Sequence, residues 1–366
     1  MLSASDEDRS AVWSPPASGN VQVRRSFNFP RDHLAALTAN RNPSYEPEIY
    51  RIHKGVESML QAGLEGDFTT VHDLARIIPG GQLRIRTKIG EGMYSKVYGA
   101  TINKTHKVAI KWMNCTNLRS EIRDKFLPRE ISNWSKICHP NILRLFAVVD
   151  GASSKAMFCE LSEYGDLLRI LQKSGPRFPF AQKTLWLGQI AKAIDYLHSR
   201  NIAHRDLKCE NCLYFPNDII KVTDFGFCVE TQRAGELSQT FCGSRAYSAP
   251  ELIRGEPYDV FKVDIWALGV IVAIVMNHTM PFVDSSGTDN SDFITQLQEQ
   301  RIFIHNSSVS SKHLKMCQDT LDCLLRQHPP ARPDSATLMF LPWWKCVTTW
   351  QGEHIHLRQR IFECFC

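Results

Sequence analysis

The stretch that decides the fold reads His204-Arg205-Asp206-Leu207-Lys208-Cys209-Glu210-Asn211. It places a carboxylate (Asp206), an ammonium group (Lys208) and an amide (Asn211) close together in the chain. A carboxylate can accept a hydrogen bond from a hydroxyl, an ammonium group can neutralise a charged phosphoryl group, and an amide oxygen can bind Mg²⁺. A polar loop assembled by chance is the alternative, and the flanking sequence argues against it.

Downstream, Asp224-Phe225-Gly226 supplies a second carboxylate that can bind the same metal, and Phe225 can act as a packing switch. Cys209 and Cys212 form a C-x-x-C spacing, which could indicate zinc or redox chemistry. No second pair with ligand spacing lies nearby, and the polar motif has the stronger claim on this loop.

Upstream lies a glycine-rich turn, Gly90-Glu91-Gly92-Met93-Tyr94-Ser95-Lys96-Val97. A Gly-x-Gly turn lets backbone amides approach phosphate oxygens without interference from Cβ atoms. Alone, the turn leaves a dinucleotide-binding loop and a plain hairpin open. It lies between strand patterns at Leu83–Arg86 and Lys107–Lys111 with no helix after it, which argues against the dinucleotide fold. Ser95 stands where a third glycine is usual.

The second strand pattern ends in Val108-Ala109-Ile110-Lys111. A lysine on a strand is ordinarily a solvated surface charge. To hold phosphates it needs a carboxylate that aims it, and Glu130 stands where the first helix after these strands should supply one.

These motifs resemble the eukaryotic protein-kinase superfamily from about Leu83 to Trp344. Lys208 resembles the Ser/Thr class. H-R-D-L-K-C-E-N, D-F-G-F and the run Glu236–Glu251 further resemble the testis-specific serine/threonine kinases, within the calmodulin-dependent-kinase-like group. The resemblance implies an α+β, two-lobed kinase fold with a small antiparallel sheet plus one helix, a larger mainly helical lobe, and a ligand cleft between them.

The resemblance also implies ATP with Mg²⁺, for which Mn²⁺ can substitute. Asp206 and Lys208 are then catalytic, and Asn211 and Asp224 hold the metal. Glu160-Leu161-Ser162 is the hinge that pairs with adenine, Cys159 guards the back pocket, and Asp166 lies near the ribose. The implied ATP-binding residues are Ile89, Gly90, Glu91, Gly92, Met93, Tyr94, Ser95, Lys96, Val97, Ala109, Lys111, Glu130, Glu160, Ser162 and Asp166.

Three structural residues and two regulatory ones follow from the same resemblance. Glu251 is expected to pair with Arg332, and Asp264 to brace the catalytic loop; loss of one partner of a buried pair is strongly destabilising. We expect phosphorylation of Thr240 to order its loop opposite Arg205, by an upstream kinase or by the chain itself. A plain polar loop threonine is the alternative.

The implied partners are protein substrates with Ser or Thr acceptors. Asp166 and Glu210 could bind basic side chains, so we expect a preference for Arg at the third position before the acceptor. The alternative is that both are solvated acids. A sperm role is implied by the resemblance alone.

Composition is that of an ordinary globular protein, with 43% hydrophobic and 22% charged residues among 366. A net charge of +5 is mild, so we expect no nucleic-acid partner. The start is polar, and the longest apolar stretch, Ile265–Met276, is too short to span a bilayer. We therefore expect no membrane span and a cytoplasmic location, with the nucleus as the alternative.

The twelve cysteines are expected to be thiols. The last three residues, Cys364-Phe365-Cys366, resemble a prenylated tail, but we expect them to be unmodified.

The domain organisation predicted from these patterns has four parts. Residues 1–46 are expected to be disordered. Residues 47–82 carry two helical patterns, which we expect to dock on the next domain or to bind a partner. The first places Ile49, Ile52 and Val56 on one face, and the second follows a possible cap at Thr70 and ends at Pro79-Gly80-Gly81. The catalytic domain covers 83–345, with lobes at 83–160 and 161–345, and 346–366 is a tail. The long N-terminal extension departs from the resembled family, whose members usually start near the glycine-rich turn.

There are three rival functions. A pseudokinase scaffold should have lost Lys111, Glu130, Asp206, Asn211 or Asp224, and none is lost. A binding module in residues 1–80 would work without the catalytic domain. A small-molecule kinase on a related fold is disfavoured by the intact segment from Asp224 to Glu251.

Overall fold

The structure is a computed structural model, which describes residues 22–25, 45–61, 63–64, 66–116, 118–232, 235–283, 291–299, 301–305 and 309–344. It divides into two compact units. The first comprises Met1–Lys136 and Arg144–Leu161, and the second Ile137–Leu143 and Ser162–Cys366. The tail expected at 346–366, with its last cysteines, lies outside the described residues.

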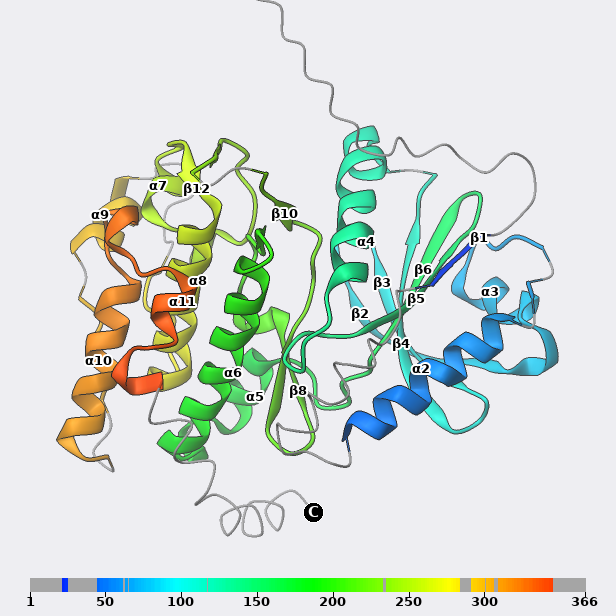
Figure 1. The fold of residues 1–366 in the computed structure, drawn as a ribbon, viewed down its shortest axis with the longest axis horizontal. Helices are drawn as coiled ribbons and strands as arrows, with labels where there is room; N and C mark the ends of the chain where they lie inside the picture. Colours follow the sequence, from blue (N-terminus) through cyan, green and yellow to red (C-terminus); the bar gives the residue numbers. More distant parts are fainter. Residues whose placement is uncertain are drawn as a thin grey trace, which may run out of the picture. The chain divides into compact units, whose positions relative to one another are not determined.

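The first unit is built on an antiparallel six-stranded sheet in the order β1-β5-β6-β4-β3-β2 (Figure 1). Its strands are β1 (Gln22–Arg25), β2 (Leu83–Glu91), β3 (Lys96–Ile102), β4 (His106–Asn114), β5 (Leu145–Asp150) and β6 (Ser154–Cys159). Helix α4 (Leu127–Lys136) lies on one side of this sheet, and α2 (Tyr45–Gln61) and α3 (Val71–Ile77) lie on the other (Figure 1).

The N-terminal extension forms part of the core of this unit. The apolar positions of α2 recur at helical spacing, and Val56 and Met59 are 1% and 0% exposed. They belong to one buried cluster with Val108 and Ile110 of β4 and with Phe158 of β6. Successive strand residues point to opposite faces, so this layer covers the face of β4 that alternates with the one carrying Lys111. We expected one helix beside the sheet; the described unit has α2 and α3 in addition to α4.

The loop between α2 and α3 is fixed to the turn between β5 and β6. Asp67 Oδ1 accepts a hydrogen bond from the Ala152 amide at 3.1 Å, and Phe68 is 1% exposed. A Cβ on Gly151 would lie 2.6 Å from Asp67 Oδ1, so only glycine permits this close approach. The extension is therefore held by polar contacts as well as by apolar packing.

Helix α3 begins and ends where the sequence predicts. The Thr70 side chain accepts from the Asp73 amide, and the Asp73 carboxylate accepts from the Thr70 amide, which makes a capping box. Pro79-Gly80-Gly81 ends the helix, with Gly80 at φ 69° and Gly81 at φ 60°. Both glycines adopt the left-handed region that other residues avoid.

Strand β1 differs from the expectation of disorder over 1–46. It pairs antiparallel with β5, Gln22 opposite Asp150 and Arg25 opposite Ala147. Pairing supplies backbone hydrogen bonds to the outer side of β5, which would otherwise be an open sheet edge. The expectation does not hold for these four residues, and most of the rest of the segment lies outside the described residues.

The second unit is mainly helical, and this together with the antiparallel sheet of the first confirms the expected α+β class. Three pairs of short strands accompany the helices: β7 (Ile202–Ala203) with β10 (Val229–Glu230), β8 (Cys212–Phe215) with β9 (Ile219–Val222), and β11 (Leu237–Ser238) with β12 (Tyr258–Asp259). The helices are α5 (Leu167–Ser174), α6 (Phe180–His198), α7 (Pro250–Ile253), α8 (Val260–Asn277), α9 (Ser291–Glu299), α10 (Ser311–Leu324) and α11 (Ser335–Leu338).

Helix α8 is long and apolar enough to cross a membrane by length and composition. Of its residues, 83% are buried inside the structure, as in the core helix of a globular protein. Such a helix is weak evidence for a membrane span, and the apolar stretch Ile265–Met276 lies within it.

Candidate active site

In the first unit, Lys111 and Glu130 form an ion pair. Lys111 Nζ lies 2.6 Å from Glu130 Oε1, and the two side chains are 14% and 4% exposed. Strand β4 carries Lys111 and helix α4 carries Glu130. Because both residues lie on regular elements, the carboxylate holds the lysine ammonium group in a fixed position. The arrangement is what a lysine needs in order to present its charge to a phosphate.

The glycine-rich turn joins β2 and β3 as a hairpin. Gly90 pairs with Val97 and Glu91 with Lys96, and the Gly92 amide donates to the Ser95 carbonyl at 2.8 Å. Ser95 therefore closes the turn through its backbone. Met93 at the tip is 84% exposed. The expected nucleotide residues Ile89–Val97 thus lie on one hairpin, on the same sheet as Ala109 and Lys111.

In the second unit, Asp206 is the centre of a hydrogen-bond network. Its Oδ2 accepts from Lys208 Nζ at 2.8 Å and from Asn211 Nδ2 at 3.1 Å. The residue is 5% exposed. Buried carboxylates need such partners, and these hold the side chain in one orientation. The three polar residues picked out in the catalytic stretch are therefore brought into contact.

Ser244 is a site residue that sequence reasoning missed. Its hydroxyl donates to Asp206 Oδ1 at 2.9 Å, and Lys208 Nζ donates to its Oγ at 2.7 Å. It ties the segment before Glu251 to the catalytic loop. Next to it, Gly243 has φ 90°, and a Cβ there would lie 2.4 Å from the Arg205 carbonyl oxygen. That glycine was the available signal, because it marks a close backbone approach.

Asn211 and Asp224 are suited to a divalent cation. Asn211 donates its Nδ2 to Asp206, and within the described parts of the chain its Oδ1 accepts no hydrogen bond. Asp224 has φ 67°, a left-handed conformation that is uncommon outside glycine. Among the described residues no group of three or more His, Cys, Asp or Glu could hold a metal. Mg²⁺ is commonly bound by one or two carboxylates plus substrate phosphates, so the donor set fits that ion.

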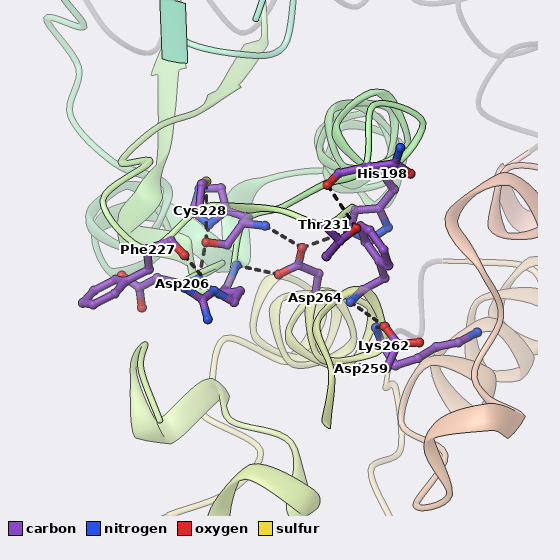
Figure 2. Close-up of polar contacts among 12 residues, drawn as sticks. His198, Asp206, Phe227, Cys228, Thr231, Asp259, Lys262 and Asp264 are labelled. Carbon is purple, nitrogen blue, oxygen red and sulfur yellow. Dashed lines mark hydrogen bonds and ion pairs between the residues drawn. The ribbon is translucent and has the colours of Figure 1, made fainter. Parts of the chain in front are cut away.

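Asp264 fixes the backbone of the catalytic stretch. It accepts hydrogen bonds from the amides of His204 and Arg205, each at 2.8 Å, and from His198 Nε2 at 2.9 Å (Figure 2). Burial alone would raise the pKa of Asp264, but the hydrogen bond from His198 and the nearby His204 outweigh it and lower the pKa. The carboxylate is therefore ionised and holds Arg205 at φ 63°.

Arg205 faces the segment from Asp224 to Glu251, which we name the activation segment, but its described contacts are not with Thr240. Its Nε donates to the Phe227 carbonyl at 2.8 Å, and its guanidinium lies 3.5 Å from Ser238 Oγ. Thr240 is exposed; its amide donates to Ser238 Oγ, and its carbonyl accepts from Tyr258 at 2.7 Å. The Thr240 hydroxyl thus lies on the same short segment as Ser238 without bonding to Arg205.

Glu251 and Arg332 form a buried bidentate pair. The two guanidinium nitrogens lie 2.6 and 2.8 Å from the two carboxylate oxygens. The Arg332 and Glu251 side chains are 0% and 3% exposed. Arg332 Nε also donates to the Arg326 carbonyl. This satisfied pair anchors the end of the activation segment and does not take part in chemistry.

The hinge residues have mainly local partners. Cys159 is 3% exposed, its thiol lies 3.6 Å from the Ala109 carbonyl, and burial raises its pKa to about 12. Ser162 donates its hydroxyl to the Tyr214 carbonyl at 2.7 Å. Asp166 caps α5, accepting from the Arg169 amide at 2.9 Å. The Glu160 amide pairs with the Arg144 carbonyl.

Cys209 and Cys212 do not resemble a metal or redox pair. Both are 0% exposed, and burial raises the pKa of each thiol. The thiolate is the metal ligand and the nucleophile, so a raised pKa disfavours both roles. They pack as small apolar side chains beside the catalytic loop.

Comparison with known proteins points to one family. The family described as protein kinase domain matches residues 83–344. The human testis-specific serine/threonine-protein kinase 3 is 38% identical over 259 residues, which cover 70% of this chain and 93% of that protein. The human testis-specific serine/threonine-protein kinase 4 is 32% identical over 295 residues, which cover 76% of this chain and 86% of that protein. The human SNF-related serine/threonine-protein kinase is 31% identical over 78% of this chain but 35% of its own length.

Proposed function

The chain belongs to the protein kinase family and is a protein-serine/threonine kinase, and we propose that it is a basophilic one, dependent on Mg²⁺ and activated at Thr240. The family brings ATP, a divalent metal and protein substrates with it. The observation that carries the proposal is that Lys111–Glu130 and Asp206–Lys208–Asn211 are each assembled within their own unit.

Asp206 receives the substrate hydroxyl in this proposal. A hydroxyl that donates to the Asp206 carboxylate is oriented for attack, and the carboxylate takes its proton. Lys208 already lies 2.8 Å from Asp206 and neutralises the charge that builds on the transferred group. Ser244 holds both side chains, so the three act as one preorganised unit.

The nucleotide is positioned by the other residues. Lys111, aimed by Glu130, binds phosphate oxygens, and the backbone of the Gly90–Val97 hairpin lies over them. Asn211 and Asp224 would hold the metal, which supplies positive charge to the phosphates when bound. We propose Mg²⁺, for which Mn²⁺ can substitute, because hard oxygen donors and phosphates suit both ions.

Thr240 is proposed as the activating phosphorylation site. A phosphate there would offer three acceptor oxygens to Arg205, whose guanidinium now has the weak 3.5 Å contact with Ser238. We expect Thr240→Ala to lower kcat roughly tenfold or more, since even one charge-assisted hydrogen bond contributes about 1.5 kcal/mol. Steady-state kinetics that compare the Thr240→Ala variant with the phosphorylated wild type measure this change in kcat. Ser238→Ala is the matched control and should keep activation; equal kcat before and after phosphatase treatment of the wild type contradicts the proposal.

Glu210 is the better candidate for substrate arginine. Tyr247 donates to its Oε2 at 2.9 Å, which leaves Oε1 without a hydrogen bond among the described residues, and the side chain is exposed. Asp166 is engaged as a helix cap and lies 3.8 Å from Arg169. The wild type should prefer peptides with Arg over peptides with Ala at the third position before the acceptor. We expect Glu210→Gln to reduce this preference, measured as the ratio of kcat/KM values, about tenfold, because one charge-assisted hydrogen bond is lost. A wild-type peptide-array profile without basic enrichment would remove the claim.

The biological setting rests on the relatives' names. Several similar proteins are called testis-specific serine/threonine-protein kinases, and a role in spermatogenesis is proposed here on that likeness alone. The cytoplasm, with the nucleus as the alternative, is proposed as the location on the composition of the sequence.

A further inference from the structure

Two adjoining cavities on the helical unit share Lys183 and Pro176 in their walls. The larger, of about 780 Å³, also involves the end of α8 and the segment 301–305, including Arg301 and Phe303. The smaller, of about 540 Å³, involves Arg177. We name the two cavities together the Lys183 groove. None of the residues described above as the candidate active site lines the larger cavity or the smaller one.

The described walls of the Lys183 groove contain basic residues and no Asp or Glu. Lysine and arginine are supplied by Lys183, Arg177 and Arg301; histidines 278, 305 and 313 add groups that can become positive. Among the residues that the structure describes, neither this lysine nor either of these two arginines forms an ion pair with a carboxylate. Concave surfaces of one charge sign concentrate ligands of the opposite sign.

Lys183 is the most telling of these residues because it is only 3% exposed. A buried ammonium group normally has an acidic partner, since removing a charge from water is costly. Its described side-chain contact is instead His278 Nε2, at 2.6 Å. Burial lowers the pKa of Lys183 to about 8, and burial together with Lys183 lowers the pKa of His278. An anion beside Lys183 would relieve this penalty.

Helix geometry adds a second contribution of the same sign. The first residues of α6, Phe180 and Ala181, and the cap of α10, Ser310, line the smaller cavity. Helix α6 begins after Pro179 without a side-chain cap. In α10, by contrast, the Ser310 hydroxyl accepts from the His313 amide. Helix N-termini carry partial positive charge, so two of them on one cavity favour an anion there, and α6 adds uncapped amide donors.

We propose that the Lys183 groove is a docking site for an acidic peptide segment of a partner protein. Its size is that of a site for several groups, well beyond one small ion. Phe303, 58% exposed, and Met280 provide apolar contacts in the larger cavity. A peptide that carries carboxylates next to apolar side chains matches both the charge and the lining.

The test uses the full chain carrying Asp206→Asn, so that binding is measured independently of phosphoryl transfer. The probe is a short fluorescein-labelled peptide of alternating Glu and Leu, compared by anisotropy with a counterpart in which Gln replaces every Glu. We expect the Glu peptide to bind at least roughly tenfold more tightly, and added salt to weaken it.

Variants locate the site. Lys183→Met, Arg177→Gln and Arg301→Gln should each weaken binding of the Glu peptide about tenfold, whereas Lys315→Gln, on an exposed position of α10 outside the groove, should not. The two arginine variants change exposed residues and keep the test valid if Lys183→Met does not fold. Equal binding of the two peptides, or unchanged binding by both arginine variants, overturns the proposal. So does binding at this groove of inorganic phosphate, an RNA oligonucleotide or anionic vesicles in place of the peptide.

Discussion

Asp206→Asn is expected to lower kcat about a thousandfold while the protein stays folded, because it removes a general base. The asparagine oxygen can still accept from Lys208, so the network around Ser244 and Asn211 largely survives. The amide cannot take the proton of the substrate hydroxyl. Steady-state kinetics with Mg·ATP and a peptide, together with the melting temperature of each protein, measure the change.

Glu210→Gln is the matched control, as it makes the same carboxylate-to-amide change in the same loop. With a peptide that lacks upstream arginine it should leave kcat unchanged, because Glu210 is exposed and is bound to Tyr247. An Asp206→Asn protein within a few-fold of the wild-type kcat would remove Asp206 from the role of base.

Met59→Asp in helix α2 is expected to destabilise the protein by more than about 4 kcal/mol. Met59 is 0% exposed and lies in one core cluster with Val108 and Ile110 of the strand that carries Lys111. An unpaired carboxylate in that core has no partner to offset its desolvation. We expect loss of soluble folded protein, and of kinase activity with it, as measured by thermal unfolding and by activity per folded molecule.

Ser58→Asp is the control on the same helix. Ser58 is exposed, so the added charge should change stability by no more than about 0.5 kcal/mol. Equal stability of the two variants would mean that the extension is a separable module. The expected outcome instead makes residues 45–81 part of the small catalytic unit, although the family match begins at residue 83.

Local sequence patterns predicted the helices and strands better than they predicted which elements pack against one another. The spacing of Ile49, Ile52 and Val56 predicted a helix with one apolar face, and Thr70 predicted the start of α3. An apolar face shows only that something covers it. That α2 covers β4 and β6 could not be predicted from the sequence, because nothing local encodes which distant strands it meets.

The contacts of the candidate active site also divide into local ones, which the sequence predicts, and long-range ones, which it does not. Asp206, Lys208 and Asn211 are close in sequence, so their contact follows from one short loop. Ser244 reaches Asp206 only because the chain returns there 38 residues later. Asp166 caps α5 through a contact three residues away, which is a local signal, and its expected place near the ribose stays a prediction.

One assay tests most directly whether the chain transfers phosphate to protein hydroxyls. The 366-residue chain, phosphorylated on Thr240, is incubated with Mg²⁺, γ-labelled ATP and a basic protein, beside its Asp206→Asn and Lys111→Met variants. We expect label on serine and threonine with the wild type and almost none with either variant. Absence of label with the wild type, or equal label with Asp206→Asn, would contradict it.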